Sequence, residues 1–588
     1  MRSPSSPPDR RQLLQGALAL GAASLLPGWA HSATPALATL SGDDIRLTID
    51  HATVKIDGRV GHAVTMNGTV PGPLIRLKQG RTVRLHVTNN LAEDTSIHWH
   101  GLLVPFQMDG VPGVSFPGIK PGETFVYEFP VIQSGTYWCH SHSGLQEQEG
   151  HYAPIIIDPA GEDPIAYDRE HVLMLSDYSF MHPHTIFQRL KGQGGVFNFQ
   201  KQTVGGLLAG KDQTLAERRE WAAMRMDPTD ISDVTGAAYR FLVNGHGFDD
   251  NWTGLFTPGE RVRLRFVNAA AQTIFNVRIP GLKLTVVASD GQAVRPVEVD
   301  EFQIGNAETY DVIVQPTADQ AYTLVAEAVD RSGMGRATLA PRPGMSAAVP
   351  SLRARPLTTM KDMGMDHSAM GGMAGMDHAA MGHAAPVAAP GMGSPRARGS
   401  DVMAAGMEMN MLDRRNAPQV PLGPGVQMIA PMPTDRTGDP GQGLESVGHR
   451  VLVYKDLIAL EPNPDTRPPS REMEIRLTGN MERFMWGFDG KKFSERPAPY
   501  TLRTGERVRV TLVNDTMMTH PIHLHGHFFE LVHGPVGHMP RKHTVNVAPG
   551  GKVTFDVTGE AGDWAFHCHM LYHMHAGMFQ VFSVRGAA

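Results

Sequence analysis

The chain has 588 residues and a formal net charge of −6, from 53 basic and 59 acidic residues, which excludes an overall basic nucleic-acid-binding protein. Two cysteines exclude a disulfide-stapled scaffold, and 41% apolar residues are enough for buried cores. At roughly 150 residues per domain, the length predicts three or four domains. The unusual feature is the count of 28 histidines and 32 methionines, because imidazole and thioether groups both bind metals.

The first 33 residues have the features of an export signal. The pair Arg10-Arg11 precedes an apolar stretch from Leu13 to Leu26, and Gly28-Trp29-Ala30 offers a small-x-small cleavage site. This order predicts a signal peptide over residues 1–33, and the paired arginines favour the twin-arginine export route. The apolar stretch is too short to span a membrane, and no later stretch reaches about 18 apolar residues. We therefore expect a periplasmic protein with no integral membrane segment.

Three later segments share one pattern. Residues 80–89 read GRTVRLHVTN, residues 259–268 read GERVRLRFVN and residues 505–514 read GERVRVTLVN. Alternating apolar residues after a glycine are typical of a half-buried β-strand that follows a turn. Three copies predict an all-β protein with three related β-sandwich domains, at about residues 42–160, 165–345 and 446–588. The stretch Thr214–Met226 is more helical, and we expect it to form an insertion in the second domain.

Nine residues beyond the closing asparagine, the first and third copies have the same pair of histidines. The first copy has His98 and His100, the third has His523 and His525, and the second has Val277 at the matching position. Residues two apart on a strand point to the same face, so each pair can converge on a metal ion. Ordinary core or surface histidines would not explain two pairs matched in register between repeats.

A second alignment, which places Gly135 on Gly562, adds another His-x-His pair to each of these two domains. The added pairs are His140 with His142 and His567 with His569. Two imidazoles, one thiolate and a weak axial thioether are the ligands of a blue-copper electron-transfer site. The third domain has such a set in His520, Cys568, His573 and Met578. At the aligned positions the first domain has Thr95, Ser141, Gln146 and His151, in the same order.

The remaining eight histidines form four pairs, two from each terminal domain. Two strands of one domain cannot surround a large metal cluster, so we infer that the first and third domains face each other around a polynuclear site. Cys568 lies between two ligands of that site, so its copper would be joined to the cluster through Cys-His peptide links. Single electrons would enter at the blue copper and collect at a cluster that can reduce dioxygen.

These motifs resemble the four copper signatures of the multicopper oxidases, over nearly the whole mature chain. The resemblance implies three consecutive cupredoxin-like Greek-key β-sandwich domains and an enzyme that couples four one-electron oxidations to reduction of O2 to two waters. It also implies four coppers per chain, one type 1, one type 2 and two type 3. The implied ligands are His520, Cys568, His573 and Met578 for type 1, His98 and His523 for type 2, and His100, His140, His142, His525, His567 and His569 for type 3.

Reduction of O2 to water consumes protons, so acidic residues near the cluster matter. Asp109 matches the acid that this family places near the type 2 copper, and a turn aspartate before Gly110 is the alternative interpretation. Several bacterial relatives have a glutamate directly after the histidine that matches His573, where this chain has Met574. Glu147, Glu149 or a chain of waters is left to supply protons, and the sequence does not choose among them.

Cys139 stands next to His140 but alternates to the opposite face of the strand. We interpret it as a buried structural thiol rather than a second thiolate ligand. A disulfide between Cys139 and Cys568 would destroy the blue-copper site, so both cysteines are expected to be unpaired.

Residues 360–411 contain 12 of the 32 methionines, together with many Gly, Ala and Pro. We interpret residues 346–445 as a flexible Met- and His-rich linker between the second and third domains. Thioethers prefer Cu(I), which makes these methionines candidate substrate ligands; a biased linker without a role is the alternative. Candidate Cu(I) sites are Met365, Met370, Met376 and Met381 in the linker, and Met517, Met518, Met570 and Met574 beside the predicted blue-copper site.

With this linker the chain resembles the copper-resistance protein A family within the multicopper oxidases, and residues 225–230, 251–256 and 485–492 add to the likeness. The resemblance implies a periplasmic copper-resistance enzyme that oxidises Cu(I) to Cu(II) and uses O2. The Met-rich linker is a candidate for copper sequestration as well, and periplasmic copper chaperones are candidate partners, although the sequence does not tell whether a second protein delivers the copper. A laccase-like oxidase of phenols and a non-enzymatic copper store are the alternatives. Deleting residues 360–411 would impair Cu(I) oxidation by a cuprous oxidase but spare or improve phenol oxidation by a laccase-like enzyme. For a copper store, copper resistance would persist in the Cys568→Ser variant.

Overall fold

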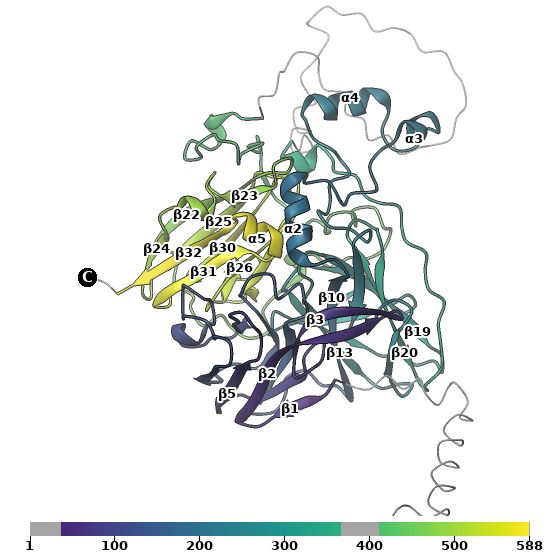
Figure 1. Cartoon of the computed structure of the whole chain (residues 1–588), viewed down its shortest axis with the longest axis vertical. Coiled ribbons are helices and arrows are strands. Elements are labelled where there is room, and N and C mark those ends of the chain that lie inside the picture. The colour runs from purple at the N-terminus through teal and green to yellow at the C-terminus, as the bar shows by residue number, and fades with distance from the viewer. Residues whose placement is uncertain (1–36, 366–410, 587–588) are drawn as a thin grey trace, which may run out of the picture.

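The computed structural model describes residues 37–365 and 411–586. The predicted signal peptide over residues 1–33 lies outside these ranges, as do Met370, Met376 and Met381. Within them the chain is mostly strands, packed as three β-sandwiches (Figure 1). This confirms the all-β class. No helix in the described ranges is long and apolar enough to cross a membrane.

The first sandwich packs a four-stranded sheet on a five-stranded one. The four-stranded sheet has the order β3 (Arg59–Met66), β2 (Asp44–Ile56), β5 (Thr82–Asn89) and β7 (Thr124–Pro130). The other sheet has the order β1 (Thr39–Ser41), β4 (Leu74–Lys78), β9 (Tyr152–Asp158), β8 (Gly135–His140) and β6 (His98–His100).

The second sandwich carries the helical insertion. Its larger sheet has the order β11 (Tyr239–Val243), β10 (Arg169–Ser179), β13 (Val262–Asn268), β18 (Thr309–Val314), β15 (Leu284–Ser289) and β16 (Gln292–Val299). Its smaller sheet has the order β12 (Trp252–Leu255), β20 (Met334–Ala340), β19 (Tyr322–Ala328), β14 (Phe275–Arg278) and β17 (Glu301–Ile304). The helices between β10 and β11 are α2 (Pro183–Gly192), α3 (Val204–Leu208) and α4 (Leu215–Ala223).

The third sandwich contains the short helix α5 (Leu571–Ala576) directly after its last but one strand. One sheet has the order β23 (Met485–Phe488), β22 (Arg471–Asn480), β25 (Arg507–Asn514), β30 (Gly551–Thr558), β27 (Phe529–Leu531) and β28 (Arg541–Lys542), and β21 (Thr434–Asp435) also pairs with β30. The other has the order β24 (Tyr500–Arg503), β32 (Phe579–Arg585), β31 (Gly562–Cys568), β26 (His520–Leu524) and β29 (Thr544–Val547).

The three repeated segments form equivalent strands, β5, β13 and β25, as the alternation predicts. Their alternating apolar side chains point into the three cores and are buried. The expectation of half-burial is wrong for β13, where Arg263 and Arg265 are buried too. Domain 1 covers that face: Arg265 donates to Thr136 Oγ1 at 3.0 Å, and both arginines pair with Asp311. Charges at this depth are tolerated because each one is paired.

The predicted helical insertion is confirmed by α4, whose first turn has a capping box between Thr214 and Glu217. Beside it, a buried cluster joins Trp221 to Met363, Met365, Met428 and Met517. The structure thus places Met365 inside a packed cluster. Residues on both sides of 366–410 belong to the packed body, and the domain limits given above stay predictions.

Candidate metal centres

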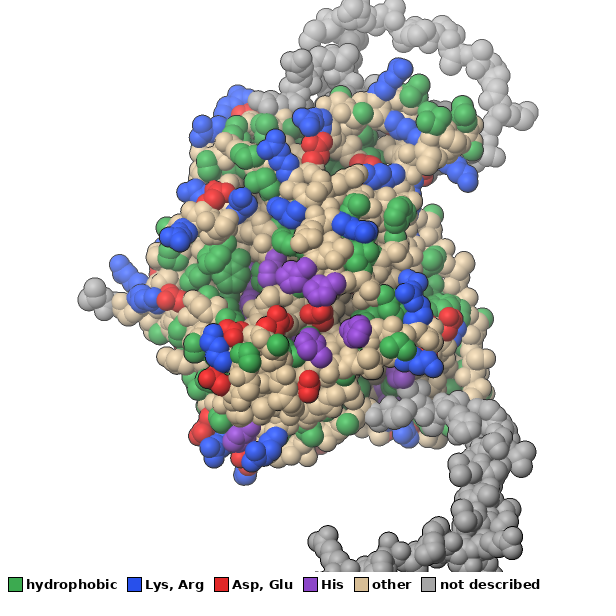
Figure 2. Space-filling model, in the orientation of Figure 1, with side chains coloured by type: hydrophobic (Ala, Val, Ile, Leu, Met, Phe, Trp, Pro, Cys, Tyr) green, Lys and Arg blue, Asp and Glu red, His purple; other side chains and the backbone are tan. Residues whose placement is uncertain are grey.

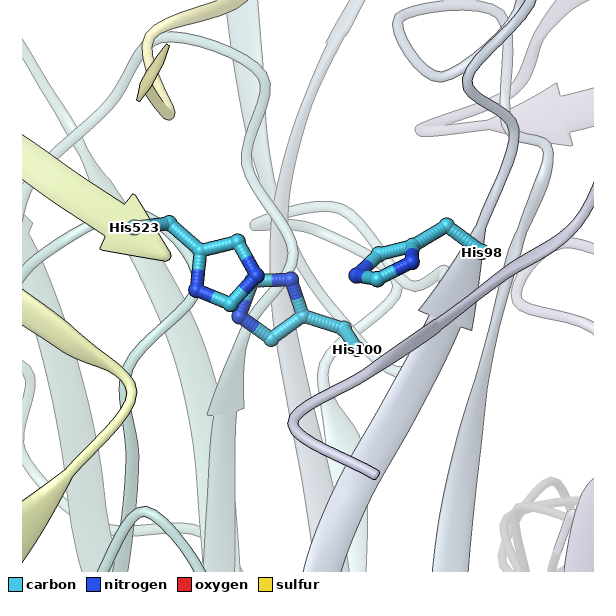
Figure 3. A group of neighbouring side chains, drawn as sticks. All are labelled: His98, His100 and His523. Atoms are coloured by element: carbon cyan, nitrogen blue, oxygen red, sulfur yellow. The ribbon is translucent and has the colours of Figure 1, made fainter. Parts of the chain in front are cut away.

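Strands from domains 1 and 3 bring all eight predicted cluster histidines together. Pairing of β6 with β8 sets His98 opposite His140, and pairing of β26 with β31 sets His523 opposite His567. Figure 3 shows His98 and His100 approaching His523 from the other domain. Three triads have ligand atoms within 4.8 Å of one another, and each draws on both domains: His98, His100 and His523; His100, His140 and His569; His142, His525 and His567.

Ring nitrogens of these histidines converge on one another across the domain interface. His567 Nε2 lies 3.0 Å from His525 Nε2 and 3.3 Å from His142 Nε2, and His140 Nε2 lies 3.3 Å from His569 Nε2. Burial, and then the neighbouring imidazoles, lower the pKa of His567 to about 4 and hold the pKa of His140 and His569 well below 6.5. These three imidazoles are therefore neutral, with lone pairs free to bind a metal ion.

A second set of donors lies within domain 3. Cys568 Sγ is 3.5 Å from His520 Nδ1 and 3.7 Å from His573 Nδ1, and the two nitrogens are 3.2 Å apart. Helix α5 turns the chain back so that His573 reaches Cys568, and Trp486 stacks on His573 with ring centroids 4.0 Å apart. Met578 is fully buried, and its carbonyl oxygen accepts from the Cys568 amide at 3.2 Å. Burial raises the pKa of the Cys568 thiol, so metal binding has to displace its proton.

Asp109 connects histidines of two triads. Its Oδ2 is 2.9 Å from His525 Nδ1, its Oδ1 is 3.4 Å from His98 Nδ1, and its carbonyl oxygen is 2.7 Å from that same nitrogen. It also stands in a turn, at the end of the 3-10 helix Phe106–Met108, before Gly110 with φ +84°. A Cβ at Gly110 would lie 1.8 Å from the Ile97 oxygen, so the turn is tied to the strand that bears His98. Asp109 is therefore both a turn residue and an acid next to the cluster histidines.

Of the two candidate glutamates, Glu147 reaches the cluster and Glu149 does not. Glu147 is buried, with Oε2 2.7 Å from His140 Nδ1 and Oε1 3.9 Å from His569 Nδ1. Burial, and then the charge of Asp177, hold the pKa of Glu147 well above its usual value. Glu149 points to the surface, where its Oε1 is 3.8 Å from His182 Nε2.

Sequence analysis missed Asp233, whose Oδ2 is 2.6 Å from His573 Nε2 and also accepts from Gln272 Nε2 at 3.0 Å. Asp233 lines a cavity of about 350 Å³ between the helical insertion and domain 3. The run Asp227, Asp230 and Asp233 after two methionines was a signal, but nothing in it indicated the distant His573. Sulfur and carboxylate side chains line the cavity together: Met226, Met481, Met517, Met518, Asp227, Asp230, Asp233 and Glu482.

The other two methionines beside the predicted blue-copper site do not share one position. Met570 directly precedes α5 and is buried, while Met574 lies within α5 and is half-buried against the core. Cys139 is fully buried in the core of domain 1, and burial raises the pKa of its thiol. Both cysteines are unpaired, as predicted.

The donor sets fit copper. Neutral imidazoles and a thiolate are ligands that copper accepts, and thiolate with two imidazoles is not a hard-cation site. Nε2 of His98, Nε2 of His523 and Nδ1 of His100 are buried without a hydrogen-bond partner. An unpaired buried nitrogen is costly unless a bound ion uses its lone pair.

Profiles of the multicopper oxidase family match residues 48–162, 170–349 and 466–587. The chain belongs to the multicopper oxidases, copper enzymes that use O2 as oxidant. It is 49% identical to "Copper resistance protein A" of Escherichia coli and 48% identical to that of Pseudomonas syringae pv. tomato, in each case over 97% of this chain and 98% of the relative.

Solved structures show the same fold at low identity. The multicopper oxidase Fet3p, which functions in iron import, superposes with a TM-score of 0.60 at 18% identity, over 93% of this chain and 90% of Fet3p. The laccase from Botrytis aclada gives a TM-score of 0.58 at 22% identity, over 95% of this chain and 89% of the laccase. These likenesses speak for the three-domain fold alone, so the substrate has to be argued from this chain's own residues.

Proposed function

We propose that this multicopper oxidase is a periplasmic copper-resistance enzyme that oxidises Cu(I) to Cu(II) and reduces O2 to water. Residues 1–33 would direct its export by the twin-arginine route. The names of the two relatives at 48–49% identity support a role in copper resistance. The single observation that carries the substrate assignment is the cavity lined by methionines and carboxylates that touches His573 through Asp233.

The proposed copper assignment follows the donor sets. His520, Cys568, His573 and Met578 would hold the type 1 copper, and His98 and His523 the type 2 copper. Of the type 3 ligands, one triad is His100, His140 and His569, and the other is His142, His525 and His567. When bound, these four coppers would supply one-electron redox chemistry that ends in four-electron reduction of O2.

The chain's own residues orient these donors. Asp109 Oδ2 faces His525 Nδ1 and its carbonyl faces His98 Nδ1, which leaves Nε2 of each ring as the ligand atom. Glu147 does the same at His140, and its raised pKa lets it hold a proton beside the cluster. Asp109 and Glu147, or a chain of waters, would supply the protons that several bacterial relatives take from a glutamate where this chain has Met574.

The cavity suits an ion that changes oxidation state. Thioethers such as Met517 and Met518 prefer Cu(I), whereas carboxylates such as Asp230 prefer harder cations. Burial raises the pKa of Asp230 to about 6, so this carboxylate is charged at neutral pH and attracts a cation. The hydrogen bond that Asp233 Oδ2 accepts from His573 Nε2 connects the cavity directly to a proposed type 1 ligand.

The test compares O2 uptake with stabilised Cu(I) and with a phenol, in wild type and in Met517→Leu/Met518→Leu. The variant should lose Cu(I) oxidation about tenfold or more and keep phenol oxidation, because leucine keeps the apolar volume but removes the ligand. Met334→Leu, at a buried methionine on β20 of domain 2, is the matched control. Equal loss of both activities, or phenol oxidation that far exceeds Cu(I) oxidation in wild type, would contradict the proposal.

The structure also sharpens the deletion experiment for copper sequestration. Removing residues 360–411 would delete Met363 and Met365, which are buried against Trp221 and Met517. Removing residues 366–410 leaves this cluster in place. The shorter deletion should lower the copper bound beyond four ions per chain and slow Cu(I) oxidation without reducing phenol oxidation.

A further inference from the structure

Exposed imidazoles lie near Glu149, the candidate glutamate that does not reach the cluster. Glu149 is half-buried at the surface of domain 1, and His182 and His184 are exposed at the start of α2. In Figure 2, histidine side chains gather beside acidic ones near the centre of the face in view, at the lower end of α2 in Figure 1 and below it. Imidazole and carboxylate together are ligands for borderline divalent cations.

The contacts bring these groups close from separate parts of the sequence. His182 and His184 are stacked, with ring centroids 5.4 Å apart and an interplanar angle of 24°. The Val64 amide donates to the Glu149 carbonyl at 3.1 Å, and β2–β3 pairing sets His51 opposite Val64. His51, which is exposed, therefore lies on the strand next to the one that contacts the Glu149 backbone.

The separation between the two nearest donors suits an ion between them. His182 Nε2 is 3.8 Å from Glu149 Oε1, which is too long for a hydrogen bond. Bonds from imidazole nitrogen and carboxylate oxygen to Zn²⁺ are each about 2 Å, so an ion bridges this gap with little movement. His182 Nδ1 accepts from the His184 amide at 3.3 Å, and binding at Nε2 would move the ring proton to Nδ1 and release that weak cap.

The electrostatics of Glu149 agree with the geometry. Burial raises its pKa, and Glu93 adds to this, while His182, His51 and His184 act in the opposite direction. In residues 37–365 and 411–586, no lysine or arginine forms an ion pair with Glu149. Its countercharge is thus left to imidazoles, which bind metal ions when neutral.

We propose that Glu149, His182 and His184 form a surface site for a divalent cation, and that the ion bound there in the working enzyme is Cu(II). Nitrogen and oxygen donors without a thioether favour the oxidised ion, in contrast to the methionine-lined cavity. The site would hold product Cu(II) outside the cavity where Cu(I) is oxidised. The choice of Cu(II) as product rests on the proposed function, whereas the existence of the site does not.

The first experiment uses Zn(II), which is redox-inactive, with the copper-loaded full chain. Equilibrium dialysis and metal analysis should show one zinc equivalent fewer in Glu149→Gln/His184→Asn than in wild type. His86→Asn is the matched control, because His86 Nε2 faces Asp44 Oδ2 at 3.2 Å elsewhere on domain 1. Zinc bound by side chains of residues 366–410 is the same in all three proteins, so it cancels when their zinc equivalents are compared. Equal zinc in variant and wild type would overturn the site.

The single variants Glu149→Gln and His184→Asn repeat the measurement if the double variant does not fold, and each should weaken the same zinc equivalent. Cu(II) added to the zinc-loaded wild type should displace this zinc equivalent, since copper exceeds zinc in affinity for such donors. The variants, which lack the site, should not release this equivalent. Failure of Cu(II) to displace the zinc would overturn the assignment to Cu(II). Zinc binding with no Cu(I) oxidation in wild type would leave the site standing and contradict the proposed function instead.

Discussion

Domains 1 and 3 place different chemistry on the same strand positions. In domain 3, His520, Cys568 and His573 converge within 3.7 Å of one another. In domain 1 the aligned positions also converge, but as a neutral hydrogen-bonded network. Thr95 Oγ1 and Ser141 Oγ both donate to Gln146 Oε1, at 2.7 and 2.8 Å, and His151 Nδ1 lies 3.4 Å from Thr95 Oγ1.

The difference shows how one repeat can lose a metal site and keep its packing. All four replacements in domain 1 are buried, so a ligand set without its metal would leave polar atoms unsatisfied. Side chains that satisfy one another remove that cost. The His-x-His pairs were kept in both domains because the triads each need donors from both sides of the interface. Under the proposed function, one electron-entry site would therefore serve a cluster whose donors come from two domains.

The largest effect is expected from Cys568→Ser, which gives domain 3 the residue that domain 1 has at Ser141. The hydroxyl does not supply the soft thiolate that a blue-copper site requires. Cu(I) oxidation should fall to background and the blue absorbance should vanish, while copper analysis should still find the copper held by the eight histidines. Visible absorption, metal analysis and O2 uptake check this.

Cys139→Ser is the control for that variant, since Cys139 is buried in the core of domain 1 and forms no disulfide. It should keep the blue absorbance and the activity. Activity that persists in Cys568→Ser would show that electrons enter elsewhere and would end the comparison between the two domains.

Asp109→Asn should have the next largest effect, because Asp109 spans histidines of both domains. Loss of a carboxylate that orients metal ligands typically costs about 10–100-fold in metal affinity or activity. O2 uptake should fall by that range while the blue absorbance of domain 3 stays. Asp94→Asn, at an exposed aspartate that pairs with Lys120, should change neither. A variant with lower blue absorbance would mean that Asp109 acts on folding rather than on the cluster.

Asp233→Asn should lower Cu(I) oxidation about tenfold, the low end for a group that contacts a metal ligand. The amide keeps a hydrogen bond to His573 but removes one negative charge from the cavity. Cu(I) oxidation should therefore lose more than phenol oxidation, mainly through a higher KM. Asp319→Asn, at an exposed aspartate paired with Arg342, is the control. If phenol oxidation falls as far as Cu(I) oxidation, Asp233 tunes the type 1 site instead of binding substrate.

The convergence of the candidate ligands could be predicted from sequence because the repeats place them at fixed distances from a recognisable strand. Their contacts within one domain, such as His98 with His140, follow from strand pairing. Asp233 could not be predicted, since it lies 340 residues from His573 in an insertion that no other repeat has. The choice between Glu147 and Glu149 depends on which way a short turn points. Burial of Arg265 depends on the docking of domain 1, which strand alternation within domain 2 cannot report.

The smallest effect, and the one most specific to the comparison, is expected from Gln146→Ala in domain 1. The substitution leaves the hydroxyls of Thr95 and Ser141 buried without their acceptor, and removes the bond from Gln146 Nε2 to Glu93 Oε1 at 2.8 Å. An unsatisfied buried group costs about 1–3 kcal/mol, so the free energy of unfolding should fall by about that amount. Gln79→Ala, whose amide donates to the exposed Ile132 carbonyl, should stay within about 0.5 kcal/mol of wild type. Denaturant unfolding measures the free energy of unfolding of both variants.

The blue absorbance and Cu(I) oxidation should be unchanged in Gln146→Ala, because the network holds domain 1 together and carries no electrons. A change in either would show that domain 1 still takes part in electron entry.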